Sequence, residues 1–386
     1  MRNVTHRARS VIAVLSLLVA SAPSFGQIAK GACKFLGNIS EGNPVASYDT
    51  YWNQMSPENA GKWGSVQSST SSSYNWANLD KIAAWSKKTG NPWKFHTLVW
   101  GQQQPSDANS ASYATIEKWF DAVHTRYPDV QMIDVVNEAY PSHAPAGYKG
   151  VLGTEATKSG YTGEFAWIFQ AFKMARARWK DASKTKLIYN DYNNIEYNSE
   201  NTWQVNFCKA AKAQNVPIDG IGVQAHDAWK LKTSDVKAKI DAIAATGFPV
   251  YVTEYDIGQN GSNATPTAQD DTNQKNIMAD QMPMFWMHPK IAGVTYWGIT
   301  VGRTWRTGTG IESSSGVARP ALTWLKDYIP KNLNAPCPPT AGIESREPVA
   351  LAKSGSSMVV RQVAGRLVTG VERDGQFMEL SALGRR

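Results

Sequence analysis

Short apolar runs that end in polar or aromatic residues recur eight times along the chain, and amphipathic helical patterns separate most of them. The runs are Phe35–Ile39, Trp52–Glu58, Lys94–Trp100, Met132–Glu138, Leu187–Asp191, Ile221–His226, Val250–Glu254 and Val294–Trp297. The helical patterns are Leu79–Thr89, Tyr113–Arg126, Glu164–Trp179, Trp203–Gln214, Thr233–Thr246, Gln269–His288 and Ala321–Tyr328. Eight strands alternating with helices predict an α/β fold, a closed (β/α)8 barrel, and a doubly wound open sheet is the alternative.

The composition fits a globular protein. The 386 residues are 42% hydrophobic and 19% charged, which excludes a disordered chain and a coiled coil. The net charge of +8 comes from dispersed Lys and Arg residues, so we expect no nucleic-acid partner. Beyond the N-terminal region, the sequence contains no apolar segment long enough to predict a membrane span.

The first 26 residues have the pattern of a secretory signal peptide. Arg2, Arg7 and Arg9 precede the apolar run Val11–Ala20, and small residues follow it. This order is typical of a signal that is removed during export. We therefore expect cleavage between residues 22 and 27, and a secreted protein.

The chain after the signal divides into three unequal parts. We expect the barrel to occupy residues 27–333 and a proline-rich linker to follow at 334–340. Residues 341–386 are a small tail with short alternating apolar stretches. The tail is either a β-rich appendage, used for cell-surface retention or secretion, or a disordered extension, because so short a segment can barely hold a core of its own.

Two of the apolar runs lead directly into a glutamate. Glu138 lies in the segment Asp134–Ala139, and Glu254 lies in the segment Tyr251–Asp256. As the fourth and seventh strands of a barrel, these runs would end on opposite sides of its mouth. Glycosidic-bond cleavage needs such a facing pair, with one carboxyl protonated and the other ionised. For a single glutamate at a strand end, a helix cap or an ion pair with arginine would be the favoured explanation. For two of them, each in such a segment, the catalytic interpretation is favoured.

Seven motifs within residues 34–333 resemble those of a known family. They are Glu58–Trp63, His96–Trp100, Val136–Glu138, Asn190–Asn193, Gly220–His226, Thr253–Asp256 and Trp297–Gly298. In this order, they resemble the motifs of the glycoside hydrolase family 10 endo-β-1,4-xylanases. The resemblance implies a TIM barrel that hydrolyses internal β-1,4-xylosidic bonds of xylan with retention of configuration.

The resemblance also implies catalytic roles. Glu138 matches the acid/base, and we expect an apolar wall or a nearby negative charge to keep it protonated at neutral pH. Glu254 matches the nucleophile, which must stay ionised. His226 and Gln224, on the preceding strand, are expected to donate hydrogen bonds to Glu254, and Asp256 is a candidate for orienting His226.

Further residues match the substrate-binding part of the family. Asn137 resembles the residue that binds the 2-hydroxyl of the reacting sugar, and Asn190 and Asp191 are expected to support the site. The residues that resemble the polar floor under the non-reducing-side sugars are Glu58, Asn59, Lys62, His96 and Gln103. The aromatic residues that resemble walls against sugar faces, with core packing as the alternative, are Trp100, Trp297 and Trp305.

The chain departs from the family pattern at three positions. Gly101 replaces a histidine, Val301 replaces an aspartate and Gly61 replaces a methionine that many relatives have there. These departures concern the sugar subsites rather than the glutamates. After the predicted signal peptide, the other histidines are expected to be surface or packing residues, and they are His124, His143 and His288.

No motif indicates a metal or a cofactor. The sequence lacks His-Glu-x-x-His, paired Cys-x-x-Cys and Gly-x-Ser-x-Gly. The glycine pattern at residues 220–225 lies within a strand rather than at a strand-to-helix turn, which argues against a dinucleotide site. Cys33 and Cys337 flank the barrel and could form a disulfide if its ends lie side by side, whereas Cys208 is expected to be buried and free.

These features together predict a secreted, monomeric, retaining endo-1,4-β-xylanase that acts on xylan or xylo-oligosaccharides without a cofactor. A β-1,4-glucanase or a mixed xylan and glucan hydrolase is the first alternative. A carbohydrate-binding protein without catalytic activity is the second, although the chain keeps both glutamates.

Overall fold

The computed structural model describes residues 27–141, 143–144, 147–258 and 265–338, and the backbone of three further strands. The predicted signal peptide at residues 1–26 lies outside the described residues, as does most of the predicted tail. No helix in the described part of the chain is long and apolar enough to cross a bilayer.

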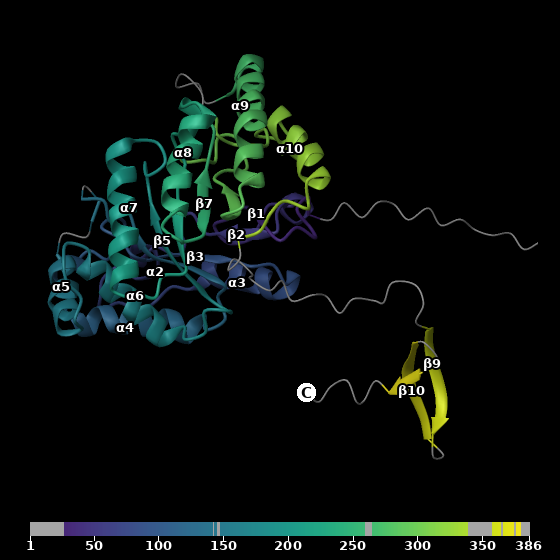
Figure 1. The fold of residues 1–386 in the computed structure, drawn as a ribbon, viewed down its shortest axis with the longest axis horizontal. Coiled ribbons are helices and arrows are strands. Elements are labelled where there is room, and N and C mark those ends of the chain that lie inside the picture. The colour runs from purple at the N-terminus through teal and green to yellow at the C-terminus, as the bar shows by residue number, and fades with distance from the viewer. Residues whose placement is uncertain are drawn as a thin grey trace, which may run out of the picture.

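Eight parallel strands form one sheet that curves into a barrel, and helices lie around it (Figure 1). They are β1 (Phe35–Ile39), β2 (Gln54–Ser56), β3 (Lys94–Val99), β4 (Met132–Asn137), β5 (Lys186–Asp191), β6 (Gly220–Val223), β7 (Val250–Tyr255) and β8 (Ile291–Tyr296). The sheet runs in the order β2-β1-β8-β7-β6-β5-β4-β3, and a parallel bridge between Met55 and Trp93 joins its two edges. The predicted (β/α)8 barrel is therefore confirmed, and the open-sheet alternative is wrong.

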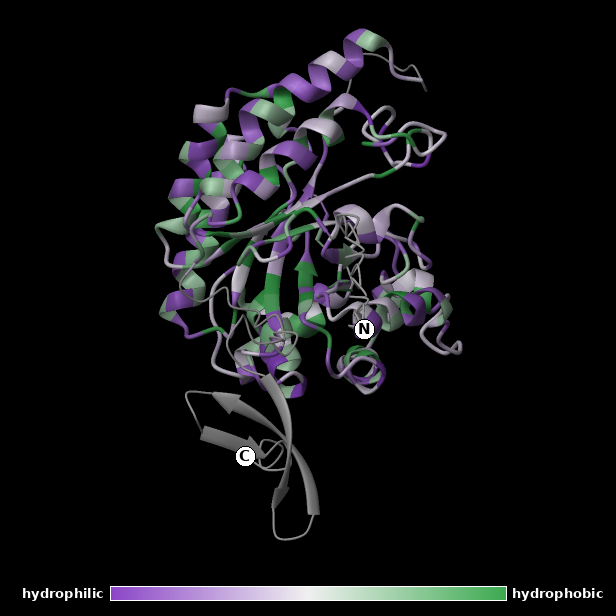
Figure 2. Cartoon of the chain, turned by 90° about the vertical axis from the view of Figure 1, so that its right-hand side faces the viewer, coloured by the Kyte–Doolittle hydropathy of each residue, from purple (hydrophilic) through white to green (hydrophobic). Residues whose placement is uncertain are grey.

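Helices surround the strands, and their outer faces are more hydrophilic than the sheet (Figure 2). They are α1 (Tyr48–Tyr51), α2 (Trp63–Val66), α3 (Ala77–Thr89), α4 (Tyr113–Arg126), α5 (Tyr148–Lys158), α6 (Ala166–Arg178), α7 (Asn198–Ala213), α8 (Thr233–Ala244), α9 (Ala268–Met287) and α10 (Pro320–Lys331). Besides the four-residue helices α1 and α2, our sequence patterns did not include α5. It buries only Tyr148, Leu152 and Ala156, so its apolar stripe is narrow.

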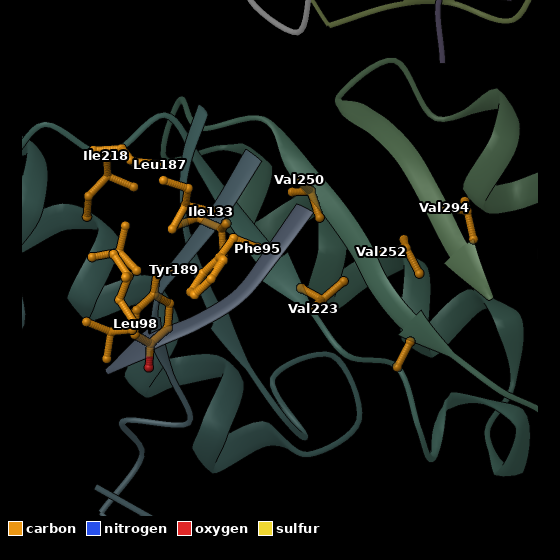
Figure 3. Packing of buried hydrophobic residues seen from close by; sticks show 14 of the residues in the cluster. Phe95, Leu98, Ile133, Leu187, Tyr189, Ile218, Val223, Val250, Val252 and Val294 are labelled. Atoms are coloured by element: carbon orange, nitrogen blue, oxygen red, sulfur yellow. The ribbon is translucent and has the colours of Figure 1, made fainter. Parts of the chain in front are cut away.

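The core has two layers because side chains alternate along each strand. The outer layer lies between strands and helices and includes Ile133, Leu187, Val250 and Val252 (Figure 3). The inner layer is a separate cluster, whose members are Phe35, Met132, Ile188, Tyr251 and Ala292. Further along the same inward face, toward the carboxyl ends of the strands, the buried residues are polar: His96, Asp134, Asn190 and Thr253. The sequence thus places a polar interior at one end of the barrel.

The two ends of the barrel domain are joined covalently. Cys33, just before β1, and Cys337, after α10, form a disulfide with a Cα–Cα distance of 6.0 Å, a pairing that the sequence analysis left open. Cys208 is free and buried in α7, as predicted. The backbone at β9 (Ser357–Val363), β10 (Arg366–Arg373) and β11 (Gln376–Glu379) forms an antiparallel sheet, which corresponds to the β-rich alternative for the tail.

Candidate active site

Glu254 reaches the barrel interior through an irregularity in β7. The pairing of β7 with β8 shifts register between Val252 and Tyr255, which is a β-bulge on β7. As a result, two successive side chains contact the same interior residue. Thr253 Oγ1 donates to Asn190 Oδ1 at 2.6 Å, and Asn190 Nδ2 donates to Glu254 Oε1 at 2.8 Å.

Glu138 leaves β4 through a sharp change of backbone direction. Its φ is 54°, in the left-handed region that residues with a side chain seldom adopt. The backbone N–H of Glu138 donates to the Asn190 carbonyl at 2.9 Å, which holds this conformation in place. Such backbone conformations concentrate at functional sites, where the surrounding structure compensates for their cost.

The two glutamates belong to one hydrogen-bonded network at the mouth of the barrel. Gln224 Nε2 donates to Glu138 Oε1 at 2.9 Å and lies 3.4 Å from Asn137 Oδ1. Asn137 Oδ1 also accepts from Asn190 Nδ2 at 2.8 Å, and the same amide group donates to Glu254. The carboxyl ends of β4, β5, β6 and β7 therefore converge on one site, as expected for a (β/α)8 barrel.

Glu254 is held in its ionised form. Burial opposes ionisation, but the hydrogen bond from His226 and the nearby charges of His96 and Lys94 lower the pKa of Glu254 to about 2. His226 Nε2 lies 3.1 Å from Glu254 Oε2, and its Nδ1 lies 3.0 Å from Asp256 Oδ2. Both contacts agree with the sequence-based expectations for His226 and Asp256.

Three polar side chains contact Glu138, where we expected an apolar wall or a nearby negative charge. Trp100 Nε1 and His143 Nδ1 lie 3.0 and 2.7 Å from Glu138 Oε2, and Gln224 bonds to Oε1. Two predictions were therefore wrong. Gln224 contacts Glu138 rather than Glu254, because Asn190 and His226 already occupy the Glu254 carboxyl. His143 is not merely a surface or packing residue, because the loop after β4 carries its ring back to Glu138.

Part of the predicted polar floor forms one cluster. Lys62 Nζ donates to Asn59 Oδ1 at 2.9 Å and to Gln103 Oε1 at 2.5 Å, and it lies 4.8 Å from the Trp100 ring centroid. Glu41, which the sequence analysis missed, accepts from Asn59 Nδ2 at 3.0 Å. No motif included Glu41, and only its position two residues after β1 hints at this role.

Glu58 lies close enough to this cluster for the charges of Glu41 and Lys62 to affect its pKa. Burial is the largest cause that raises the pKa of Glu58 to about 7. The negative charges of Glu41 and Glu254 act in the same direction, while Lys62 opposes them. Glu58 is thus a carboxyl that can gain or lose a proton near neutral pH.

The remaining predicted residues divide into buried and exposed groups. His96 Nδ1 lies 2.8 Å from Asp134 Oδ2, and Lys94 Nζ lies 2.6 Å from the same oxygen. Trp297 is almost fully buried, with its ring centroid 5.8 Å from that of His96. Trp305 is 50% exposed and donates from Nε1 to Asp256 Oδ2 at 2.8 Å. Trp305 is therefore the most exposed of the three predicted aromatic walls, and the Arg306 guanidinium lies over its ring, 4.4 Å from the centroid.

Asn190 and Asp191 support the site in different ways. We expected Asn190 only to support the site, but its side chain donates directly to the Glu254 carboxylate. Asp191 accepts from Tyr189 and from the backbone N–H of Tyr140 and Tyr192. Burial raises the pKa of Asp191 to about 7, and the charge of Glu138 acts in the same direction.

Two of the three departures from the family pattern have a steric cause. A Cβ atom at Gly61 would lie 2.3 Å from the His96 carbonyl oxygen, and one at Gly101 would lie 2.3 Å from the His143 carbonyl oxygen. Neither position has room for a side chain here. The third departure, Val301, is a buried residue after β8.

Comparisons with known proteins agree with this geometry. The family model described as Glycosyl hydrolase family 10 matches residues 20–334. The sequence is 42% identical over 302 residues to endo-1,4-beta-xylanase B of Cellvibrio japonicus (strain Ueda107), covering 76% of this chain and 45% of that relative. It is 30% identical over 282 residues to endo-1,4-beta-xylanase A of Caldicellulosiruptor saccharolyticus, covering 66% and 78%. The chain therefore spans less than half the length of the first relative.

Solved structures have the same fold. Xylanase 10B from Thermotoga petrophila RKU-1, in complex with xylobiose, superposes with a TM-score of 0.67 at 22% identity, covering 79% of this chain and 97% of that one. A psychrophilic glycoside hydrolase family 10 endo-beta-1,4-xylanase gives 0.65 at 26% identity, covering 78% and 98%. The family match over most of the sequence and these relatives establish that the chain belongs to glycosyl hydrolase family 10.

Proposed function

We propose that the protein is an endo-1,4-β-xylanase that cleaves internal xylosidic bonds of xylan with retention of configuration. The observation that carries the proposal is the pair Glu138 and Glu254 in one hydrogen-bonded network, with Glu254 held ionised. Membership of glycosyl hydrolase family 10 and two relatives that are named endo-1,4-beta-xylanases support it.

In the first step, the Glu254 carboxylate attacks the anomeric carbon while the bond to the leaving oxygen breaks. Glu138 protonates that oxygen, and a covalent glycosyl–enzyme ester forms. Asn190 and His226 orient the Glu254 carboxylate through the contacts given above. The amide oxygen of Asn137 accepts from Asn190, so its amide nitrogen is the group suited to donate to the sugar 2-hydroxyl.

In the second step, water attacks the same carbon and the ester bond breaks. Glu138, now a carboxylate, takes the proton of the water, and Glu254 leaves as a carboxylate again. Gln224 and Trp100 donate to Glu138, and such donors stabilise the charge that it carries between the two steps. Two successive inversions at one carbon give net retention.

The cluster of Asn59, Lys62 and Gln103 offers donors and acceptors for the hydroxyls of the non-reducing-side sugars. The exposed ring of Trp305, beside Asp256 and His226, is suited to pack against a sugar face. No step of this reaction requires a metal or a cofactor.

Replacing Glu254 with Ala tests the catalytic assignment. We expect kcat on xylan to fall by more than about 10³-fold, because no other group in the proposed mechanism forms the ester. The matched control is Glu164→Ala, which removes an exposed carboxylate outside the site and should keep wild-type turnover. Persistent turnover by a correctly folded Glu254→Ala protein would refute the assignment.

The wild-type protein is used to distinguish xylanase activity from β-1,4-glucanase activity. Hydrolysis rates on xylan and carboxymethylcellulose are compared, and the anomer of the first product is followed by NMR. A preference for xylan with retained configuration supports the proposal, whereas equal rates favour the mixed-specificity alternative.

We also propose that the protein is exported and acts as a monomer. The basic and apolar pattern of the first 26 residues supports export, and a disulfide between Cys33 and Cys337 suits an oxidising compartment. Cell fractionation with N-terminal sequencing is expected to find a chain cleaved between residues 22 and 27 outside the cytoplasm. Its distribution between cell surface and medium tests whether the tail retains the protein, and light scattering measures its mass.

A further inference from the structure

His143 and Ala144, in the loop between β4 and α5, pack directly on Gly101. A Cβ atom there would lie 2.3 Å from the His143 carbonyl oxygen and 2.8 Å from the Ala144 carbonyl group, distances that no side chain tolerates. At the start of α5, the Tyr148 hydroxyl donates to the carbonyl of Trp100, the residue before Gly101, at 2.8 Å. The absence of a side chain at position 101 is therefore what lets this loop approach the barrel mouth.

The approach of the loop places His143 on Glu138. His143 Nδ1 lies 2.7 Å from Glu138 Oε2, and its ring centroid lies 4.8 Å from that of Tyr192. The His143 side chain is 40% exposed, whereas that of Glu138 is 12% exposed. His143 thus connects a largely buried carboxyl to solvent, and Glu138 Oε2 accepts from Trp100 as well.

We propose that His143 is a positioning residue for the acid/base, which holds the Glu138 carboxyl through Oε2 and sets the alkaline limit of activity. The inference rests on the proposed function, because it assigns Glu138 the acid/base role. It assigns His143 no contact with the substrate. The loop geometry at Gly101 and the bond to Glu138 are the two independent observations behind it.

The electrostatics give the direction of the effect. The hydrogen bond to Glu138 is the largest cause that raises the pKa of His143, so the pair favours a charged imidazolium beside the carboxyl. A positive charge there promotes loss of the Glu138 proton. Removal of His143 removes this charge and should therefore extend activity to higher pH. The other titratable groups around the pair are Asp191 at the end of β5, Tyr192 directly after it, Tyr140 on the same loop as His143, Lys62 just before α2, and Glu254 on β7.

The test compares the pH profile of kcat/KM on xylan for the wild type, His143→Gln and His143→Ala. We expect the alkaline limb of both variants to move to higher pH by about 0.5–1 unit, because both lose the charge. Loss of kcat should be larger in His143→Ala, because Gln keeps a donor for Glu138. His124→Gln, which removes a histidine on α4, should leave the profile unchanged.

Gly101→Ala provides a second route to the same result. Its Cβ atom should displace the loop and reproduce the shifted limb, with the glutamates themselves unaltered. An alkaline limb that stays in place, or moves to lower pH, in both His143 variants would overturn the inference. If the wild type hydrolyses xylan with retention in that case, the proposed function stands. If the wild type lacks this activity, the proposed function fails instead.

Discussion

At the scale of single residues, His226 is held between the carboxylates of Glu254 and Asp256. Burial disfavours its charge, but Asp256 and Glu254 outweigh this and raise the pKa of His226 to about 10, from 6.5. The stability that follows from a raised pKa is complete below about pH 6.5 and is lost as the pH rises toward 10. The lowered pKa of Glu254 and the raised pKa of His226 arise from the same contact. The two shifts therefore represent one contribution to stability and not two.

Replacing His226 with Gln should destabilise the protein in a pH-dependent way. At pH 6 the variant leaves two buried carboxylates without their cation, and we expect a loss of about 3 kcal/mol in the free energy of unfolding. The difference from the wild type should shrink toward pH 10, where the wild type loses the charge as well. Urea unfolding at pH 6, 8 and 10 measures this, and a difference that stays constant over the series would contradict the charge of His226.

The residues of the site differ in how far sequence alone predicts them. Glu138 and Glu254 are identifiable because each follows an apolar run, and the end of a run fixes the end of a strand. The hydrogen-bond partner of Gln224 is not identifiable from the sequence, because the backbone turns after β6, where Ala225 has a φ of 65°. His143 lies on a loop without periodicity, so only the packing of that loop on Gly101 reveals its contact.

At the scale of elements, apolar runs predict where strands lie but not how they end. The bounds predicted for β1 match the structure, whereas the run Trp52–Glu58 yields only the three residues of β2. The bulge on β7 has no sequence signature of its own, because it arises from pairing with β8. Yet it is this bulge that turns both Thr253 and Glu254 toward Asn190. The chemistry thus depends on a departure from the regular alternation that identifies the strand.

At the scale of the whole molecule, the disulfide and the two glutamates of the site lie at opposite ends of the barrel. The glutamates are at the carboxyl ends of β4 and β7, whereas Cys33 lies before the amino end of β1. The disulfide joins Cys33 to Cys337, which are 304 positions apart in the sequence, and the pairing of β1 with β8 also brings the first and last strands together. Closure of the barrel was predictable from the alternation of elements. The narrow contact between β2 and β3 was not, because it is a single bridge.

Removing the disulfide should therefore lower stability and leave catalysis nearly intact. In the double replacement Cys33→Ser and Cys337→Ser, the unfolded chain regains the freedom that the bond removes, and we expect a loss of about 2–5 kcal/mol in unfolding free energy. The value of kcat on xylan below the melting transition should stay within about twofold of the wild type. Dithiothreitol should destabilise the wild type by a similar amount and leave the double variant unaffected. Equal melting temperatures for the two proteins under oxidising conditions would show that the bond contributes nothing to the barrel.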